Sequence, residues 1–320
     1  MNHLERRCRV AVLRMCADAS RGSANGPKIT IGVCVKNGAA DIGKAITSIM
    51  EQDFPHENIE VIFVDDGSED GTLSVIQSYL PKLDMQVKLF HQKWKGLGQS
   101  RDTIVDCATG KYIIWVDSDM TLTKDFVTRQ AEFMELNSDV AVGKGQYGLC
   151  PQKNLVSYLE NIEFVASHVR RREKPNLLPL GTGGSIYRVE AIRQVDGFDP
   201  NIKGSGEDTD AEFRLRKAGW KLEATAPVFY EKRRGTWKSL WIEYFWFGQS
   251  GSNLSESERQ IVGAYRFWPP FMLFVEVSRV VTAYQLSRCK LVFLMPLHFV
   301  FKRVAWSLGM LKLVFGKLRM

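Results

Sequence analysis

Cysteine is scarce in this chain, and its cysteines are not grouped. The 320 residues include six cysteines, none of them in a Cys-x-x-Cys pair. Zinc sites and disulfide frameworks bring cysteines close together along the sequence, so neither is expected here. We expect reduced, structural cysteines, which favours a cytosolic compartment.

Long apolar runs are also missing. The longest one near the C-terminus, Leu291 to Phe301, has about eleven residues and contains Pro296 and His298. A helix that spans a bilayer needs roughly twenty apolar residues. Residues 1–27 contain no continuous apolar core of seven or more residues, so they lack the pattern of a secretory signal. We expect a flexible extension over 1–27.

The net charge of +7 is unevenly distributed. Residues 266–320 hold nine Lys or Arg against one acid, Glu276, which leaves 34 basic and 35 acidic residues in positions 1–265. A uniformly basic body would have indicated nucleic acid. A nearly neutral body with a basic, apolar tail instead predicts no nucleic-acid partner and contact with an anionic membrane surface.

The tail, residues 251–320, interleaves apolar runs with cations. The runs Phe267–Val275, Leu291–Met295 and Leu311–Phe315 alternate with Lys and Arg, a pattern typical of amphipathic helices in the membrane interface. The alternative is that these helices pack on the rest of the protein or pair between subunits.

Upstream of the tail, short apolar runs alternate with segments of helical periodicity. Runs at 29–35, 61–65, 86–90 and 112–116 predict strands of a mainly parallel sheet flanked by helices, which is an α/β fold. A helix follows the first strand, with its core positions spaced i, i+3, i+4, i+7 and i+8: Ile42, Ala45, Ile46, Ile49 and Met50. A second helix is predicted over 100–108, ending at Gly110 in a left-handed conformation.

Two of these strands end in acidic residues. Asp117 and Asp119 follow an apolar strand and point the same way, so they can converge on one Mg²⁺ or Mn²⁺ ion. Asp65 and Asp66 end the strand about fifty residues upstream. Ligands of open α/β sheets bind outside the carboxyl ends of strands, where both pairs fall. The alternatives are ordinary surface turns and a helix cap.

A third acidic group begins a helix predicted to run to Ala218 and end at Gly219. Glu207 and Asp208 lie at its N-terminus, where the helix dipole stabilises negative charge. The same spacing predicts Ala211, Leu215 and Ala218 on the inner face, with Glu212 and Arg216 paired outside. Plain N-capping by Asp208 or Thr209 is the alternative.

The order of these motifs resembles that of the inverting family 2 glycosyltransferases, which have the Rossmann-like GT-A nucleotide-sugar fold. The matching segments are Val35-Lys36-Asn37-Gly38, Gln52-Asp53-Phe54-Pro55, Val64 to Thr72, Gly96 to Arg101, Val116 to Asp119, Gly183-Gly184-Ser185, Gly197-Phe198-Asp199, and Glu207 to Asp210 leading to Arg214-Leu215. The likeness covers about residues 28–250, which we take as the catalytic domain. Asp102 departs from the family pattern, in which an Asn often follows the Arg.

The resemblance implies roles for particular residues. Asp208 would be the general base, with Glu207 beside it, and Asp117 and Asp119 would bind the metal. Gly183 and Gly184 would line the acceptor side, although a plain turn between strands explains them equally well. The donor-binding set would be Asn37, Asp65, Asp66, Arg101, Asp117, Arg233 and Trp237. Arg101 could instead form a salt bridge at the start of its helix, and residues 232–237 could be a solvated face or a membrane rim.

The sequence thus predicts transfer of a single sugar from a nucleotide-diphospho-sugar. The Gln-x-x-Arg-Trp segment of processive members is missing. If the tail meets a membrane, the acceptor hydroxyl or phosphate is expected to be lipid-linked, at the cytosolic face. Two other functions remain open: a nucleotidyltransferase of similar fold, and a noncatalytic membrane-associated sugar-binding protein.

Overall fold

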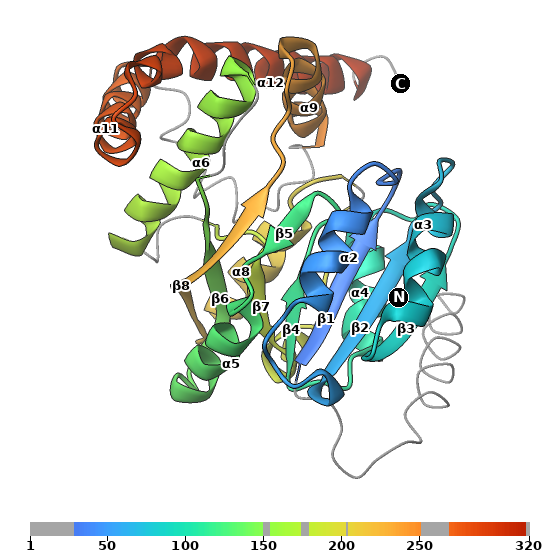
Figure 1. Ribbon diagram of the computed structural model, residues 1–320. Coiled ribbons are helices and arrows are strands. Elements are labelled where there is room, and N and C mark those ends of the chain that lie inside the picture. The colour runs from blue at the N-terminus through green and yellow to red at the C-terminus, as the bar shows by residue number, and fades with distance from the viewer. Residues whose placement is uncertain (1–28, 150–153, 174–178, 203, 251–268, 318–320) are drawn as a thin grey trace.

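The computed structural model in Figure 1 describes residues 29–149, 154–173, 179–202, 204–250 and 269–317. The extension expected over 1–27 therefore lies outside the described residues. The elements follow the order β1 (Ile29–Val35), α2 (Ile42–Met50), η1 (His56–Asn58), β2 (Ile59–Asp65), α3 (Thr72–Tyr79), η2 (Leu80–Lys82), β3 (Gln86–His91), α4 (Leu97–Cys107), β4 (Tyr112–Trp115), β5 (Met120–Leu122), α5 (Phe126–Leu136), β6 (Val140–Tyr147), α6 (Leu155–Glu173), β7 (Ser185–Arg188), α7 (Val189–Gln194), α8 (Glu207–Lys217), β8 (Lys221–Glu231), α9 (Trp237–Ser250), α11 (Pro269–Ser287), η4 (Lys290–Leu294) and α12 (Met295–Lys317).

The strands form one eight-stranded mixed sheet in the order β3-β2-β1-β4-β7-β6-β8-β5. The pairings β1–β2, β1–β4 and β2–β3 are parallel, as the βαβ pattern predicted. The second half adds antiparallel pairings of β7 with β4 and β6, and of β5 with β8, whereas β6 and β8 are parallel. Helices flank the sheet, which confirms the predicted α/β class (Figure 1).

The core forms where the predicted apolar runs meet. Strand β1 lies between β2 and β4, and its Ile29, Ile31 and Val33 are fully buried. Helix α2 covers them with an apolar face that includes Ile42 and Ile46, as predicted from the spacing. Burial of each such side chain stabilises the fold by about 1.5–3 kcal/mol.

The C-terminal helices lie together at one end of the molecule, where α12 runs across the end of α6 with α9 and α11 nearby (Figure 1). Helices α9 and α12 approach each other at glycines. A Cβ atom on Gly309 would collide with the Phe245 carbonyl of α9, and one on Gly248 would collide with the Trp306 carbonyl of α12. Helix α12, in the second half of the tail, is thus joined to α9 by close backbone contact.

Several details differ from expectation. Gly110 is not left-handed; a Cβ there would lie 2.7 Å from the backbone nitrogen of Thr30, so close packing requires the glycine. Cys34 and Cys289 are free, but Cys107 is disulfide-bonded, which corrects the expectation of reduced cysteines for that residue.

The length of the C-terminal apolar segment was also underestimated. Lys290–Lys312 has 23 residues, and by length and composition it could cross a membrane. Counting only the unbroken run up to Phe301 missed it because Lys302 and Arg303 interrupt that run.

The glycine crossing gives a test of tail packing. Gly309→Leu should push α9 and α12 apart and lower the free energy of unfolding by about 1–3 kcal/mol, the usual cost of overpacking. Thermal or urea unfolding measures the loss. Ser307→Leu, on the exposed side of the same helix, is the matched control and should leave stability nearly unchanged. Equal stability of the two variants would contradict the close approach.

Candidate active site

The strand register brings the acidic strand ends to one edge of the sheet. Val35 of β1 pairs with Asp65 of β2, and the N–H of Val116, which follows β4, donates to the Gly32 carbonyl at 3.0 Å. Asp117 therefore emerges at the same edge as Asp65. This is the carboxyl-terminal edge, at which ligands of α/β sheets bind.

Asp65 and Asp66 organise the loops at that edge. Asp66 accepts hydrogen bonds from the backbone N–H groups of Lys95, at 2.8 Å, and Gly96, at 2.9 Å. Asp65 is fully buried and lies 2.9 Å from Nδ1 of His91. The two carboxylates thus fasten the segment between β3 and α4 to the end of β2.

Asn37 connects the loop after β1 with the loop after β2. Its backbone N–H donates to Oγ of Ser68 at 2.9 Å, and its side-chain oxygen accepts the N–H of Glu69 at 2.9 Å. Asn37 has a φ of 54°, a left-handed conformation that asparagine tolerates better than most residues. The three loops at this edge are therefore tied to one another.

The two metal-ligand candidates lie close together. Burial and the nearby charge of Asp117 raise the pKa of Asp119 to about 6, while the charges of Arg234 and Arg233 oppose the rise. The Asp117 side chain is 40% exposed. Two carboxylates that repel each other at a partly exposed edge provide the hard oxygen ligands that Mg²⁺ or Mn²⁺ prefers, so the donor set fits such an ion.

Arg101 forms a buried ion pair with Glu207 and lies 3.9 Å from Asp117. The ion pair is the alternative that the sequence left open for this arginine. Burial raises the pKa of Glu207 to about 7 against the opposing charge of Arg101, and the charge of Asp208 adds to the rise. One Glu207 oxygen, Oε2, has no hydrogen-bond partner. Arg101 therefore joins the start of α8 to the Asp117 region.

A small-residue loop, 181–184, lies between Asp208 and Asp117. A Cβ atom on Gly181 would lie 3.6 Å from Oδ2 of Asp208, and one on Gly183 would lie 2.5 Å from Oδ2 of Asp117. The other Asp208 oxygen accepts the N–H of Thr209 at 2.7 Å. The candidate base and a candidate metal ligand thus face the same short loop, and any side chain at 183 would displace Asp117.

Two residues that support this loop were missed by the sequence reasoning. Lys144 of β6 is buried, and its Nζ donates to the carbonyls of Gly181 and Gly183. Glu212 accepts the N–H groups of Leu180, at 2.8 Å, and Gly181, at 2.7 Å. A lone lysine inside the apolar strand 140–147 was the available signal for Lys144.

The expected outward position of Glu212 is wrong, because Glu212 is buried on the inner side of α8. Burial raises the pKa of Glu212, and the charge of Arg216 still opposes that rise. Ala218, expected inside, is exposed. The inward positions Ala211 and Leu215 are confirmed, as is the helix end at Gly219, whose φ is 93°. The helical period was correct, but the inner face is shifted towards Glu212.

Arg233 and Trp237 make contacts with the C-terminal half of the fold. The buried Arg233 guanidinium pairs with Glu231 at 2.6 Å and lies 3.7 Å from the ring centroid of Phe164. The Trp237 ring contacts Phe301 of α12 at 4.9 Å between centroids. The other two cations of this segment are exposed: Lys232 pairs with Asp41 at 2.6 Å, and Arg234 pairs with Glu243 at 3.1 Å.

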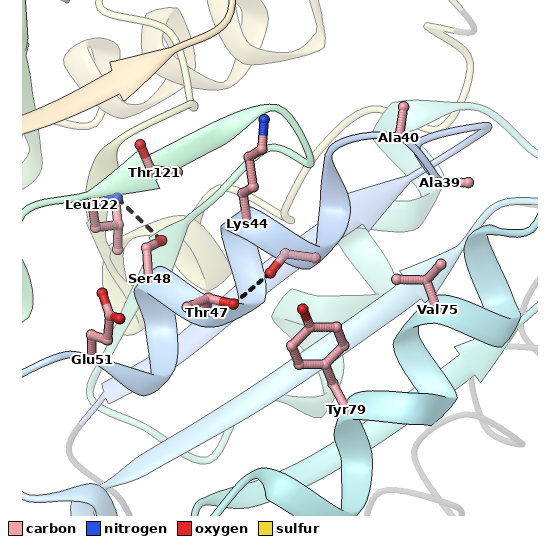
Figure 2. Close-up of a pocket in the computed structure, with 11 residues that line it drawn as sticks. Ala39, Ala40, Lys44, Thr47, Ser48, Glu51, Val75, Tyr79, Thr121 and Leu122 are labelled. Atoms are coloured by element: carbon pink, nitrogen blue, oxygen red, sulfur yellow. Dashed lines mark hydrogen bonds between the residues drawn. The ribbon is translucent and has the colours of Figure 1, made fainter.

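A separate pocket of about 470 Å³ lies between α2, α3 and β5 (Figure 2). It is bordered by Lys44, Ser48 and Tyr79 among others, and Oγ of Ser48 accepts the N–H of Leu122 at 3.2 Å. None of the site residues predicted from the sequence lines it. The candidate active site is therefore the acidic sheet edge and not this pocket.

The mixed sheet with its acidic edge has the GT-A fold. The structure is similar to that of the mannosyltransferase PcManGT from Pyrobaculum calidifontis, solved with GDP-Man and Mn²⁺. The TM-score is 0.61 at 16% identity, over 95% of this chain and 94% of that one. The model of glycosyl transferase family 2 matches residues 30–196. The chain belongs to this family.

Two curated relatives have longer chains. The poly(ribitol-phosphate) beta-N-acetylglucosaminyltransferase TarS of Staphylococcus aureus is 29% identical over 185 residues, which are 57% of this chain and 31% of TarS. The glycosyltransferase GlyA of Streptococcus pneumoniae is 32% identical over 230 residues, which are 68% of this chain and 32% of GlyA. The chain thus spans about a third of the length of these relatives.

The support of the loop by Glu212 predicts a pH effect. Burial and the charge of Asp208 raise the pKa of Glu212 to about 7 from an ordinary 4.5. Between these values the folded protein keeps a proton that the unfolded chain releases, so stability should fall as pH rises from about 4.5 to 7.

Glu212→Gln removes this titration, so its melting temperature should fall less than that of the wild type between pH 4.5 and 7.5. Glu132→Gln, on the exposed face of α5, is the control and should follow the wild type. Thermal unfolding across this range is the measurement, and identical profiles for wild type and Glu212→Gln would show that Glu212 does not titrate there.

Proposed function

We propose that the chain is an inverting, metal-dependent glycosyltransferase that moves one sugar from a nucleotide-diphospho-sugar to an acceptor hydroxyl or phosphate. The observation that carries this proposal is the loop 181–184, which faces the carboxylate of Asp208 on one side and that of Asp117 on the other. A sugar bound over such a loop would have a general base and a metal-binding group within reach.

Asp117 and Asp119 would hold a Mg²⁺ or Mn²⁺ ion, which when bound supplies positive charge for the diphosphate leaving group. The similar mannosyltransferase was solved with Mn²⁺ and a nucleotide-sugar, which supports this role. The buried pair of Arg101 and Glu207 would hold the start of α8 beside Asp117. This pairing keeps the base and the metal ligands in one rigid unit.

Asp208 would take the proton of the acceptor hydroxyl as that oxygen attacks the anomeric carbon. The nucleoside diphosphate leaves from the opposite face of the sugar, so the anomeric configuration inverts in one step. Gly183 and Gly184 would line the acceptor side, where small residues allow a sugar to approach the backbone. Gly184 has a φ of 69°, and a Cβ there would collide with the Phe229 ring, so this loop leaves no room for larger residues.

Donor binding is proposed at the loops that Asn37, Asp65 and Asp66 tie together, beside Arg101 and Asp117. Arg233 and Trp237 would support the segment that follows β8, because Arg233 contacts Glu231 and Phe164 and Trp237 contacts Phe301. Residues 28–250 would form the catalytic domain. We place the enzyme at the cytosolic face of a membrane, with a lipid-linked acceptor, on the basis of the basic, apolar residues 251–320.

The donor and the metal can be identified together. A panel of UDP-, GDP- and dTDP-sugars is incubated with Mn²⁺ or Mg²⁺, and nucleoside diphosphate release is measured with and without chelator. Release should need the metal and should fall to background in Asp119→Ala. Asp139→Ala, which removes an exposed partner of Lys221, is the control and should keep full activity. Release that persists in chelator would overturn the metal role.

The general base has its own test. Asp208→Asn should lower the rate of transfer by about 10²–10⁴-fold, the usual contribution of general base catalysis, because the amide cannot accept the proton. Affinity for the nucleotide-sugar, measured by calorimetry, should change little. A variant that transfers sugar at the wild-type rate would exclude Asp208 as the base.

A further inference from the structure

Helix α12 has its polar and apolar faces reversed relative to an ordinary surface helix. Its buried positions include His298, which is 0% exposed, and Lys302, which is 3% exposed. Five of its exposed positions are apolar and spaced by three or four residues, namely Leu297, Val300, Val304, Leu308 and Leu311. The exposed polar positions among its described side chains are Ser307 and Lys312. A helix that faces water places its apolar stripe inward, so this arrangement indicates that the outer face meets something other than water.

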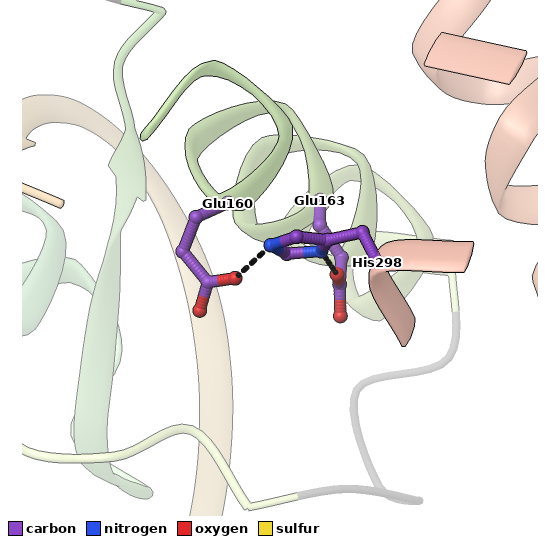
Figure 3. Close-up of side chains that lie close together, drawn as sticks. All are labelled: Glu160, Glu163 and His298. Carbon is purple, nitrogen blue, oxygen red and sulfur yellow. Dashed lines mark ion pairs between the residues drawn. The ribbon is translucent and has the colours of Figure 1, made fainter. Parts of the chain in front are cut away.

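The inner face is held in place by paired charges from α6. Figure 3 shows the His298 ring between two carboxylates, with Nε2 3.2 Å from Glu160 and Nδ1 3.3 Å from Glu163. The ammonium group of Lys302 lies 2.8 Å and 2.7 Å from the same two carboxylates. Lys302 already supplies the positive charge that balances these carboxylates, so the cluster needs no metal ion.

This cluster fixes how α12 is rotated. Breaking a buried ion pair by removing one partner is strongly destabilising, because it leaves an unpaired charge in the interior. Turning α12 so that its leucines and valines faced inward would separate Lys302 from Glu160 and Glu163. The apolar stripe is therefore kept on the outside by the charges on the inside.

Neighbouring elements add to the exposed apolar surface. Val277 and Val281 of α11 and Phe293 of η4 are each more than half exposed. In residues 29–149, by contrast, the large exposed apolar side chains are only Trp94, Leu136 and Leu149. Exposed apolar surface is thus concentrated on the C-terminal helices.

Cations accompany this surface. Three cations are exposed here: Arg288, which follows α11, Lys290 at the start of η4, and Lys312 of α12. The sequence has no Asp or Glu after Glu276. Apolar residues rimmed by cations without acids complement the acyl chains and headgroups of an anionic bilayer.

We propose that the outer face of α12, together with the exposed apolar residues of η4 and α11, is a bilayer-docking surface, and that α12 lies in the plane of one leaflet and does not cross the membrane. The 23 residues of Lys290–Lys312 would be long enough to cross, at about 1.5 Å each. A crossing helix, however, would carry the Glu160, Glu163 and Lys302 cluster into the hydrocarbon together with α6.

This orientation rests on the proposed function, which places the enzyme at a membrane. It adds that the acidic edge of the sheet lies near the lipid surface. The backbone N–H of Lys232 donates to the Asp119 carbonyl at 3.0 Å, and α9 begins at Trp237, which contacts α12. Five residues reach at most about 18 Å. An acceptor carried by a lipid headgroup would thus be within reach of the metal ligands.

Vesicle sedimentation tests the surface. The full chain is mixed with phosphatidylcholine vesicles with and without phosphatidylglycerol. Wild type should bind, more tightly with the anionic lipid. The double variant Leu297→Glu, Val300→Glu should bind at least about tenfold more weakly, because each lost apolar burial is worth a tenfold step or more. Leu136→Glu, at an exposed leucine of α5, is the matched control and should bind as wild type.

Unchanged vesicle binding by the double variant would overturn the proposal. So would a wild-type dimer in sedimentation velocity without lipid that becomes monomeric in the double variant, since the face would then be a subunit interface. Release of nucleoside diphosphate from the sugar donor needs no vesicle and is measured in parallel. Loss of binding with donor hydrolysis retained separates this surface from the chemistry of the site.

Spin labels distinguish a helix in the plane from one that crosses. Labels are attached to cysteines introduced one at a time at Leu297, Val304 and Leu311, with the free Cys34 and Cys289 replaced by Ser. Their depth in vesicles is measured by power saturation. Equal depths at the three positions are expected for a helix in the leaflet plane. A depth that changes steadily from one end to the other would show that α12 crosses the bilayer.

Discussion

Parallel pairing of β1 with β2 and β4 is the constraint on which the candidate site depends. Because parallel strands end at the same edge, the pairing brings Asp65 and Asp117 together although they are far apart in sequence. The remaining parts are attached to this edge by hydrogen bonds. Asp66 holds the loop before α4, and α4 in turn presents Arg101 to Glu207 at the start of α8. A change in strand register would separate all of these groups.

The site concentrates carboxylates that the fold has partly removed from water. Burial raises the pKa values of Glu207, Glu212 and Glu231 to about 7 and that of Asp119 to about 6. Each is opposed by a positive charge or by backbone N–H groups. Such clusters cost stability, and they occur where a protein must bind a cation or move a proton. This charge distribution is consistent with a metal-dependent transfer reaction, and it makes the loop 181–184 sensitive to the protonation of its support, Glu212.

The sequence predicted the parts of the fold that depend on local pattern. The strands at 29–35 and 112–116, the buried face of α2 and the end of α8 at Gly219 follow from apolar spacing and turn residues. The supports of the loop, Lys144 and Glu212, depend on contacts between β6, α8 and residues 180–183, which no local pattern encodes. Trp237 likewise meets Phe301 of α12 through a long-range contact that its local sequence does not indicate.

Contacts between distant parts of the sequence also explain why the length of the C-terminal apolar segment was underestimated. In the sequence, His298 and Lys302 interrupt an apolar run, which suggests a short segment. In the fold they face Glu160 and Glu163 of α6, so their polarity is used on the inside, and the outer face from Leu297 to Leu311 is mostly apolar. A buried ion pair adds little stability compared with apolar packing, but it selects one rotation of the helix over others. On the proposed docking surface, that selection would set which side of the protein is turned towards the membrane, and therefore where an acceptor would enter.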